Sequence, residues 1–242
     1  MSTEEKRSRT QILPIAQRVL EGLSDSCTRI EFAGSLRRGK EMIGDVELVV
    51  IPDGDKLYSL LDQRLLAGKI SHTPVKRWGS KYRAFIFNGV KFDVFINPDP
   101  ATFAVNFLIR TGCAEFSHRM VTMRSAGGWL PECYLVKNAR VWDRATGEAL
   151  DTPEESDVFR LWGMEMPAPE ERTEMFMPVW SEVEFERPAA SKPTFGQAAM
   201  GGRLTMERAE QIVAESKQWA LPLFGKETAT RMASEAIAKS RG

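Results

Sequence analysis

Apolar side chains recur along the first hundred residues with two spacings, and each spacing predicts a different kind of element. From about Arg9 to Leu23 they follow the i, i+3, i+4, i+7 rule of an amphipathic helix. A stripe of leucines predicts a second helix over Leu57 to Leu66. Alternating or short apolar runs predict strands at Arg29–Ala33, Asp45–Val50, Lys81–Phe87 and Val90–Ile96.

The last two of these strands are separated only by Asn88-Gly89, which is a strong signal for a tight hairpin. The second strand then places Val90, Phe92, Val94 and Ile96 on one face. Asp93 lies on the other face, and Lys91, two residues earlier, shares it.

Residues after Pro100 predict a second, more helical region. Helices are expected over Thr102–Ile109 and Glu115–Met123, broken by Thr111-Gly112, and a hairpin is expected around Lys137-Asn138. A further helix should start at Thr152-Pro153-Glu154-Glu155, with Thr152 as the cap and Glu155 completing a capping box, and end at Gly163. Beyond it we expect a Pro- and Gly-rich linker and two amphipathic helices, at Thr205–Trp219 and Lys226–Ser240.

The stretch from Ala33 to Lys40 has the residues of a phosphate-binding turn. Gly34 and Gly39 permit a sharp turn, Ser35 can donate to phosphate oxygens, and Arg38 with its neighbour Arg37 adds positive charge. Asp45 and Glu47 follow on a strand and point to the same face. Two such carboxylates suit Mg²⁺ carried by a bound triphosphate.

A third carboxylate is needed for two metal ions, and Asp93 can supply it. Asp45, Glu47 and Asp93 would then hold two ions about 3.5–4 Å apart for an in-line displacement. The alternative is that these acids belong to an ordinary solvated strand face. The turn upstream of the first two acids favours the metal site.

Three separated motifs resemble family X DNA polymerases, the DNA polymerase beta relatives. They are Gly34 to Gly39 with Gly44 to Glu47, the segment Phe107–Arg119, and Asp157–Met164 with Pro169–Arg172. The resemblance implies an α+β fold: a nucleotidyltransferase palm with a mixed β-sheet and packed helices, then a small α+β thumb. The expected divisions are a palm at 1–100, a thumb-like subdomain at 101–175, a linker at 176–204 and a helical extension at 205–242.

The resemblance also implies a role for each site residue. The expected catalytic and metal-binding residues are Asp45, Glu47 and Asp93; the nucleotide-binding residues are Gly34, Ser35, Arg38, Gly44, Thr111 and Gly112; the DNA-binding residues are Arg83, Lys91, Ser117 and His118. For Ser117 and His118, a solvent-facing helix position is the equally weighted alternative.

Two features depart from the family pattern. Ile109 and Arg110 stand where the family has aromatic residues beside the nucleotide sugar, which puts sugar discrimination in doubt. Glu47 stands where the family usually has Asp, and its extra methylene can shift the carboxylate and favour Mn²⁺ over Mg²⁺. The first helix is expected by about residue 9, so we expect the minimal palm-plus-thumb form without a lyase domain.

Charge and cysteine usage add smaller constraints. Lys plus Arg and Asp plus Glu are both 33 in 242 residues, but residues 1–150 carry 22 basic and 17 acidic side chains. A polyanion-binding face is therefore plausible on the first part of the chain. Three scattered cysteines and two histidines give no zinc-site spacing. With no leader or membrane span expected, we predict a monomeric cytoplasmic protein, or a viral protein in the host cytoplasm.

Basic and aromatic residues interleave from Lys76 to Arg83. This pattern is typical either of a DNA backbone contact or of an ordinary polar loop and edge strand, and the sequence does not decide between them.

The function that these features predict is gap-filling, template-directed DNA synthesis from deoxynucleoside triphosphates on primer–template or gapped DNA, with Mg²⁺ and with Mn²⁺ as a substitute. The alternatives are a template-independent nucleotidyltransferase acting on RNA or a small molecule, and a DNA-end-binding module whose transferase site has decayed at Glu47.

Overall fold

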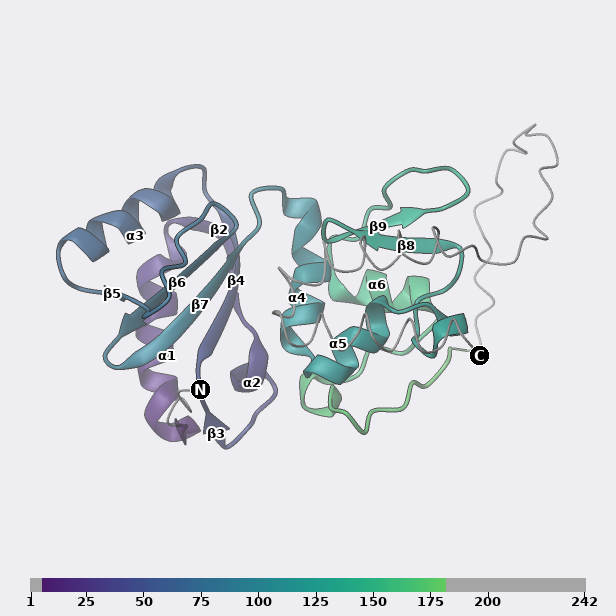
Figure 1. Ribbon diagram of the computed structural model, residues 1–242, viewed down its shortest axis with the longest axis horizontal. Coiled ribbons are helices and arrows are strands. Elements are labelled where there is room, and N and C mark those ends of the chain that lie inside the picture. The colour runs from purple at the N-terminus through teal and green to yellow at the C-terminus, as the bar shows by residue number, and fades with distance from the viewer. Residues whose placement is uncertain (1–5, 182–242) are drawn as a thin grey trace.

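The computed structural model describes residues 6–181, and its centre is a five-stranded mixed sheet (Figure 1). Strand β4 pairs in parallel with β7, and all other neighbours in the sheet are antiparallel. In spatial order the strands are β2 (Cys27–Phe32), β4 (Val46–Pro52), β7 (Val90–Ile96), β6 (Tyr82–Phe87) and β5 (Ser71–His72). This mixed sheet with packed helices confirms the predicted α+β class.

One face of the sheet is covered by α1 (Arg9–Ser24) and α3 (Lys56–Leu66) (Figure 1). The alternation along the strands accounts for this packing, because every second side chain of β4 and β7 enters the same core. These buried strand residues are Val46, Leu48, Val50, Val90, Phe92, Val94 and Ile96. Both helices and the facing positions of both strands agree with the expectation from the sequence.

The opposite face of the sheet meets α4 (Phe103–Thr111), whose Phe103 and Phe107 pack with Val49. A second core lies beyond α4. It is formed by α4, α5 (Ala114–Val121), α6 (Glu155–Trp162) and the hairpin of β8 (Tyr134–Lys137) and β9 (Arg140–Asp143). Two short strands, β1 (Arg7–Ser8) and β3 (Met42–Ile43), pair near the short helix α2 (Gly34–Arg37).

The hairpin prediction at Asn88-Gly89 is confirmed. Phe87 pairs with Val90, so Asn88 and Gly89 are the two turn residues, and both have positive φ, 49° and 70°. Positive φ at both positions matches the twist of the flanking strands. The turn therefore fixes the register that sets Ala84 opposite Asp93.

The predicted start of α6 is wrong in its details. The helix begins at Glu155, the cap is Glu154, and Asp157 accepts a hydrogen bond from the Glu154 backbone N–H at 2.9 Å. The Thr152 hydroxyl is buried and has no hydrogen-bond partner among the described residues. The predicted end at Gly163 is confirmed, with φ of 67°.

In residues 6–181 no helix combines the length and the apolar character needed to cross a bilayer. The two helices expected after residue 204 and most of the expected linker lie outside the described residues. The divisions at residues 100 and 175 remain predictions.

Candidate active site

The three predicted acids lie on the sheet face opposite α1 and α3. Glu47 on β4 is directly beside Asp93 on β7, because the parallel register pairs these two residues. Asp45 immediately precedes β4. Only 6% of Asp93 is exposed, whereas about a third of the Asp45 side chain, 34%, is accessible. The register thus sets the Glu47 and Asp93 carboxylates side by side, and Asp45 lies at the start of the same strand as Glu47.

Gly34 lets the phosphate-type turn approach Glu47. Its φ is +61°, in the left-handed region, and a Cβ there would lie 1.9 Å from Glu47 Oε2. No other residue fits this position without moving the carboxylate. Gly34 is the first residue of α2, the short helix that forms this turn. The N–H of Ala33, the residue before α2, donates to the Glu47 carbonyl at 2.9 Å.

Lys91 and Tyr82 contact the acids directly. The Lys91 Nζ lies 3.3 Å from Asp45 Oδ2 and 3.0 Å from Asp93 Oδ2. The Tyr82 hydroxyl donates to Asp93 Oδ1 at 2.6 Å. Asp93 is therefore held from both sides, which fixes its side-chain orientation.

The surroundings of Glu47 disfavour its negative charge. Burial raises its pKa to about 7, and the negative charges of Asp45 and Asp93 act in the same direction. The positive charges of Arg110 and Arg38 oppose this rise in pKa. The Arg110 guanidinium lies 3.9 Å from the centre of the Phe95 ring, and burial lowers its own pKa. Arg110 thus brings a cation from α4 to the acid face of the sheet.

The donor chemistry of the three acids fits a hard divalent cation, because carboxylate oxygens are the ligands that such ions prefer. The like charges that raise the pKa of Glu47 would be relieved by a cation. Within residues 6–181, however, no three acidic, His or Cys side chains are already arranged around a metal position. The Lys91 ammonium contacts Asp45 and Asp93 instead, so metal binding would require it to withdraw.

The turn is tied to the end of α4 by its two arginines. Arg38 donates to the Thr111 carbonyl, and Arg37 donates to the Thr111 hydroxyl at 2.5 Å. Thr111 is fully buried. Gly112 follows at the end of α4, where a Cβ would lie 2.5 Å from Phe116 and 2.6 Å from Ser117. Arg38, Thr111 and Gly112, all predicted nucleotide-binding residues, therefore lie together.

Arg37 also enters a buried ion-pair network. Glu155 receives hydrogen bonds from Arg37 at 2.7 and 3.0 Å and from Arg172 at 2.6 Å. Arg172 is 0% exposed and Glu155 is 5% exposed. Burial acts to raise the pKa of Glu155, but the bonds from the two arginines outweigh it and the pKa falls. The network joins α2, α6 and the segment after α6.

The remaining predicted residues are placed differently. Gly44 precedes Asp45 and Ser35 lies in α2. His118 lies partly buried on α5, and its DNA contact remains a prediction. Ser117 is buried and donates to the Ile109 carbonyl at 2.7 Å, so the expectation of a solvent-facing Ser117 is wrong, and the predicted DNA contact has no support in this geometry.

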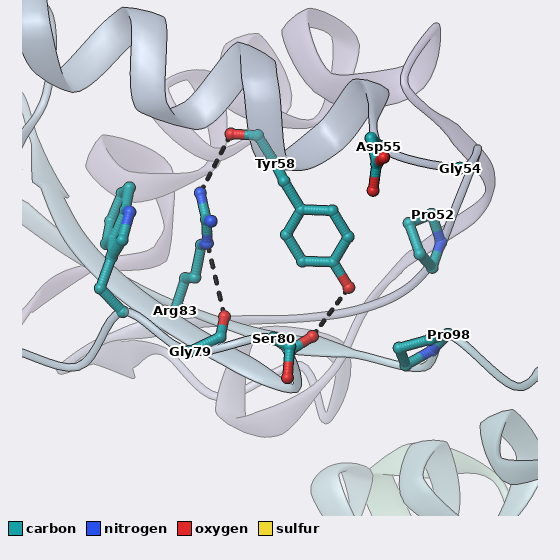
Figure 2. Close-up of a pocket in the computed structure, with 9 residues that line it drawn as sticks. Pro52, Gly54, Asp55, Tyr58, Gly79, Ser80, Arg83 and Pro98 are labelled. Atoms are coloured by element: carbon teal, nitrogen blue, oxygen red, sulfur yellow. Dashed lines mark hydrogen bonds between the residues drawn. The ribbon is translucent and has the colours of Figure 1, made fainter.

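Arg83 is the clearest departure from the predicted site. It pairs in register with Val94, so it points to the α3 side of the sheet, away from Asp93. Its guanidinium donates to Asp62 at 2.8 Å and to the Tyr58 carbonyl at 3.1 Å, and only 7% of Arg83 is exposed. Figure 2 shows Arg83 beside Tyr58 in a surface pocket that none of the three acids lines. These contacts give Arg83 a structural role, and its predicted DNA contact stays a prediction.

Two contacts in and around the candidate site were not found by sequence reasoning. Tyr82 could have been found, because the Asn88-Gly89 hairpin and the period of two put it on the same face as Asp93. Glu155 could not, because a glutamate in the first turn of a helix also fits a capping role.

The fold is thus an α+β architecture with a mixed sheet and packed helices, compatible with a nucleotidyltransferase palm. No family model matches the chain. The chain is 31% identical over 159 residues to DNA polymerase lambda of Rattus norvegicus. That similarity covers 57% of this chain and 28% of the relative, so the chain spans well under half of the relative's length. The chain therefore has partial, distant similarity to a DNA polymerase.

Proposed function

We propose that the protein is a template-directed DNA polymerase of the family X type. In this proposal it fills gaps, adding a deoxynucleotide to a primer 3′-hydroxyl with release of pyrophosphate. The observation that carries the proposal is the parallel pairing of Glu47 with Asp93, beside the Gly34 turn and Asp45. The partial similarity to a DNA polymerase supports the same class of chemistry.

Asp45, Glu47 and Asp93 are the residues proposed to hold Mg²⁺ or Mn²⁺. When bound, such ions neutralise the charge that develops on the transferring phosphoryl group and orient its oxygens. Glu47 must be ionised for this role, and its pKa of about 7 is the quantity that a bound cation would lower.

The chain's own residues have separate roles in the proposed transfer. The backbone N–H groups of α2, with Ser35 and Arg38, are proposed to bind the triphosphate, because Gly34 allows this turn to lie against Glu47. Asp93 is proposed to accept the proton of the primer hydroxyl, while Tyr82 keeps its carboxylate oriented. The Thr111 carbonyl positions Arg38.

Arg110 favours one alternative, a transferase that does not follow a template. It occupies the end of α4 beside the acids, where the resembling family has an aromatic residue. Its charge can recognise a different acceptor or a different sugar.

Extension of a one-nucleotide-gapped DNA tests the proposal. Each deoxynucleotide and each ribonucleotide is offered separately, first in Mg²⁺ and then in Mn²⁺, on four substrates that differ in the template base. We expect incorporation that follows the template base. Incorporation that ignores it would favour the template-independent transferase, and DNA binding without incorporation in either metal would favour the binding module.

A further inference from the structure

The molecule has a surface pocket of about 620 Å³, whose lining residues are drawn in Figure 2. The residues that line it include Pro52, Tyr58, Trp78, Ser80, Arg83 and Pro98. Pro52 ends β4 and Pro98 follows β7, whereas Asp45 precedes β4 at its other end. The pocket therefore lies where β4 and β7 end, whereas Glu47 lies near the start of β4 and Asp93 in the middle of β7. The proposed polymerase chemistry does not use the pocket.

The two aromatic rings of the pocket are held in place by Arg83. Its guanidinium lies 4.7 Å from the centre of the Trp78 ring and 5.1 Å from that of Tyr58. The Trp78 indole N–H donates to Asp62 at 2.7 Å, and the Tyr58 hydroxyl donates to the Ser80 carbonyl at 2.8 Å (Figure 2). The indole N–H of Trp78 and the hydroxyl of Tyr58 thus both have hydrogen-bond partners within the protein, and these bonds fix the orientation of the rings. A ligand in the pocket would therefore contact mainly the apolar surface of the two rings.

Two exposed lysines adjoin residues of this pocket in the sequence. Lys76 lies two residues before Trp78 and Lys81 follows Ser80, whereas the Arg77 guanidinium lies 5.8 Å from the centre of the Tyr82 ring, on the acid face of the sheet. The acids around the pocket are mostly engaged, since Asp62 accepts from Arg83 and Asp53 pairs with Lys56 at 2.5 Å. Asp55, at the start of α3, is the exposed exception. The local surplus of positive charge favours an anionic ligand.

A ligand that suits both features needs a flat unsaturated ring and a nearby phosphate. Paired bases in a duplex stack on each other and do not present their faces, whereas a single strand does. We propose that this pocket binds single-stranded nucleic acid, with an unpaired base against Tyr58 and Trp78 and the adjoining phosphates near Lys76 and Lys81. This binding does not require the carboxylates of the proposed active site.

Fluorescence anisotropy with a labelled 12-nucleotide thymidylate strand tests the proposal, using the full chain in EDTA. Tyr58→Leu removes the ring and keeps apolar bulk, and Tyr58→Phe keeps the ring. We expect Tyr58→Leu to weaken binding by about 10- to 100-fold, the effect of losing one stacked base, and Tyr58→Phe to bind like the wild type. A 12-mer backbone without bases should bind both variants equally.

The charge part is tested by the double variant Lys76→Ser/Lys81→Ser, with Lys69→Ser/Lys137→Ser as a matched pair of exposed lysines elsewhere. The first double variant should reduce the slope of the logarithm of the binding constant against the logarithm of the salt concentration by about 0.7 per lysine. The second double variant should leave this slope unchanged. A uridylate strand in a parallel titration shows whether RNA is bound as well as DNA.

The proposal is overturned if the wild type does not bind the thymidylate strand, if Tyr58→Leu binds as tightly as Tyr58→Phe, or if both lysine pairs act alike. Asp93→Asn should retain this binding, which separates the result from the proposed polymerase activity.

Discussion

Gly34 and Glu47 show how one residue limits another at the candidate site. The left-handed φ of Gly34 turns the chain toward β4, and the missing Cβ leaves the space that the Glu47 carboxylate fills. The sequence predicts that a turn lies here and that Glu47 shares a strand face with Asp45. It cannot predict the raised pKa of Glu47, because that depends on burial and on two acids brought in by other segments.

Gly34→Ala should destabilise the protein more than Gly54→Ala does. Both glycines have positive φ, +61° and +53°, but a Cβ at Gly54 meets nothing within 4 Å. The control Gly54→Ala therefore loses only the free energy needed to hold a non-glycine residue at positive φ, roughly 1–3 kcal/mol. Gly34→Ala loses this and adds the clash with Glu47. Urea denaturation measures both, and Glu47→Ala should recover part of the loss in Gly34→Ala. Equal losses in the two alanine variants would contradict the contact.

The stability of the metal-free protein should fall with rising pH because of Glu47. Its pKa is raised from 4.5 to about 7 in the folded state, so the folded protein holds a proton that the unfolded chain releases. Raising the pH through this window removes stability on the order of 1–3 kcal/mol relative to Glu47→Gln. Denaturation in EDTA at pH 5 and pH 8 measures this change, and a difference between the two proteins that stays constant with pH would count against it.

At the scale of elements, α2 and α6 are joined by charges rather than by apolar packing. Glu155 on α6 binds Arg37 of α2 and the buried Arg172. Sequence patterns gave the helix, its apolar face and its end at Gly163, because these depend on local spacing. They did not give the role of Glu155, because its partners lie 118 and 17 residues away in the chain.

Glu155→Gln should cost much more stability than Glu154→Gln. The first change leaves two arginines around a buried amide, and breaking a buried pair costs about 3–5 kcal/mol. Glu154 is 53% exposed in its pair with Arg29, so its loss should cost below about 1 kcal/mol. Thermal or urea unfolding of the two variants compares them directly, and similar losses would show that the Glu155 network contributes little.

At the scale of the whole molecule, the acids lie on the sheet face that also meets α4, while α1 and α3 close the other face (Figure 1). Helix α4 carries Arg110 to the acids and Thr111 to the arginines of the turn. The class of fold and the common sheet face of Glu47 and Asp93 were predictable because alternation along strands assigns each residue to a face. The hydrogen bonds of Arg83 and Ser117 could not be predicted in this way, because their partners come from other elements.

The measurement that tests the central claim most directly is the rate of single-nucleotide extension of gapped DNA by Asp93→Asn, with Asp62→Asn as the matched control. Asp93 lies in the acid cluster, whereas Asp62 holds Arg83 and Trp78 on the α3 side of the sheet. The account predicts that Asp93→Asn lowers the extension rate at least about 100-fold while DNA binding is retained. Asp62→Asn should keep most of the wild-type extension rate. Template-matched extension by Asp93→Asn at the wild-type rate would contradict the assignment of these acids.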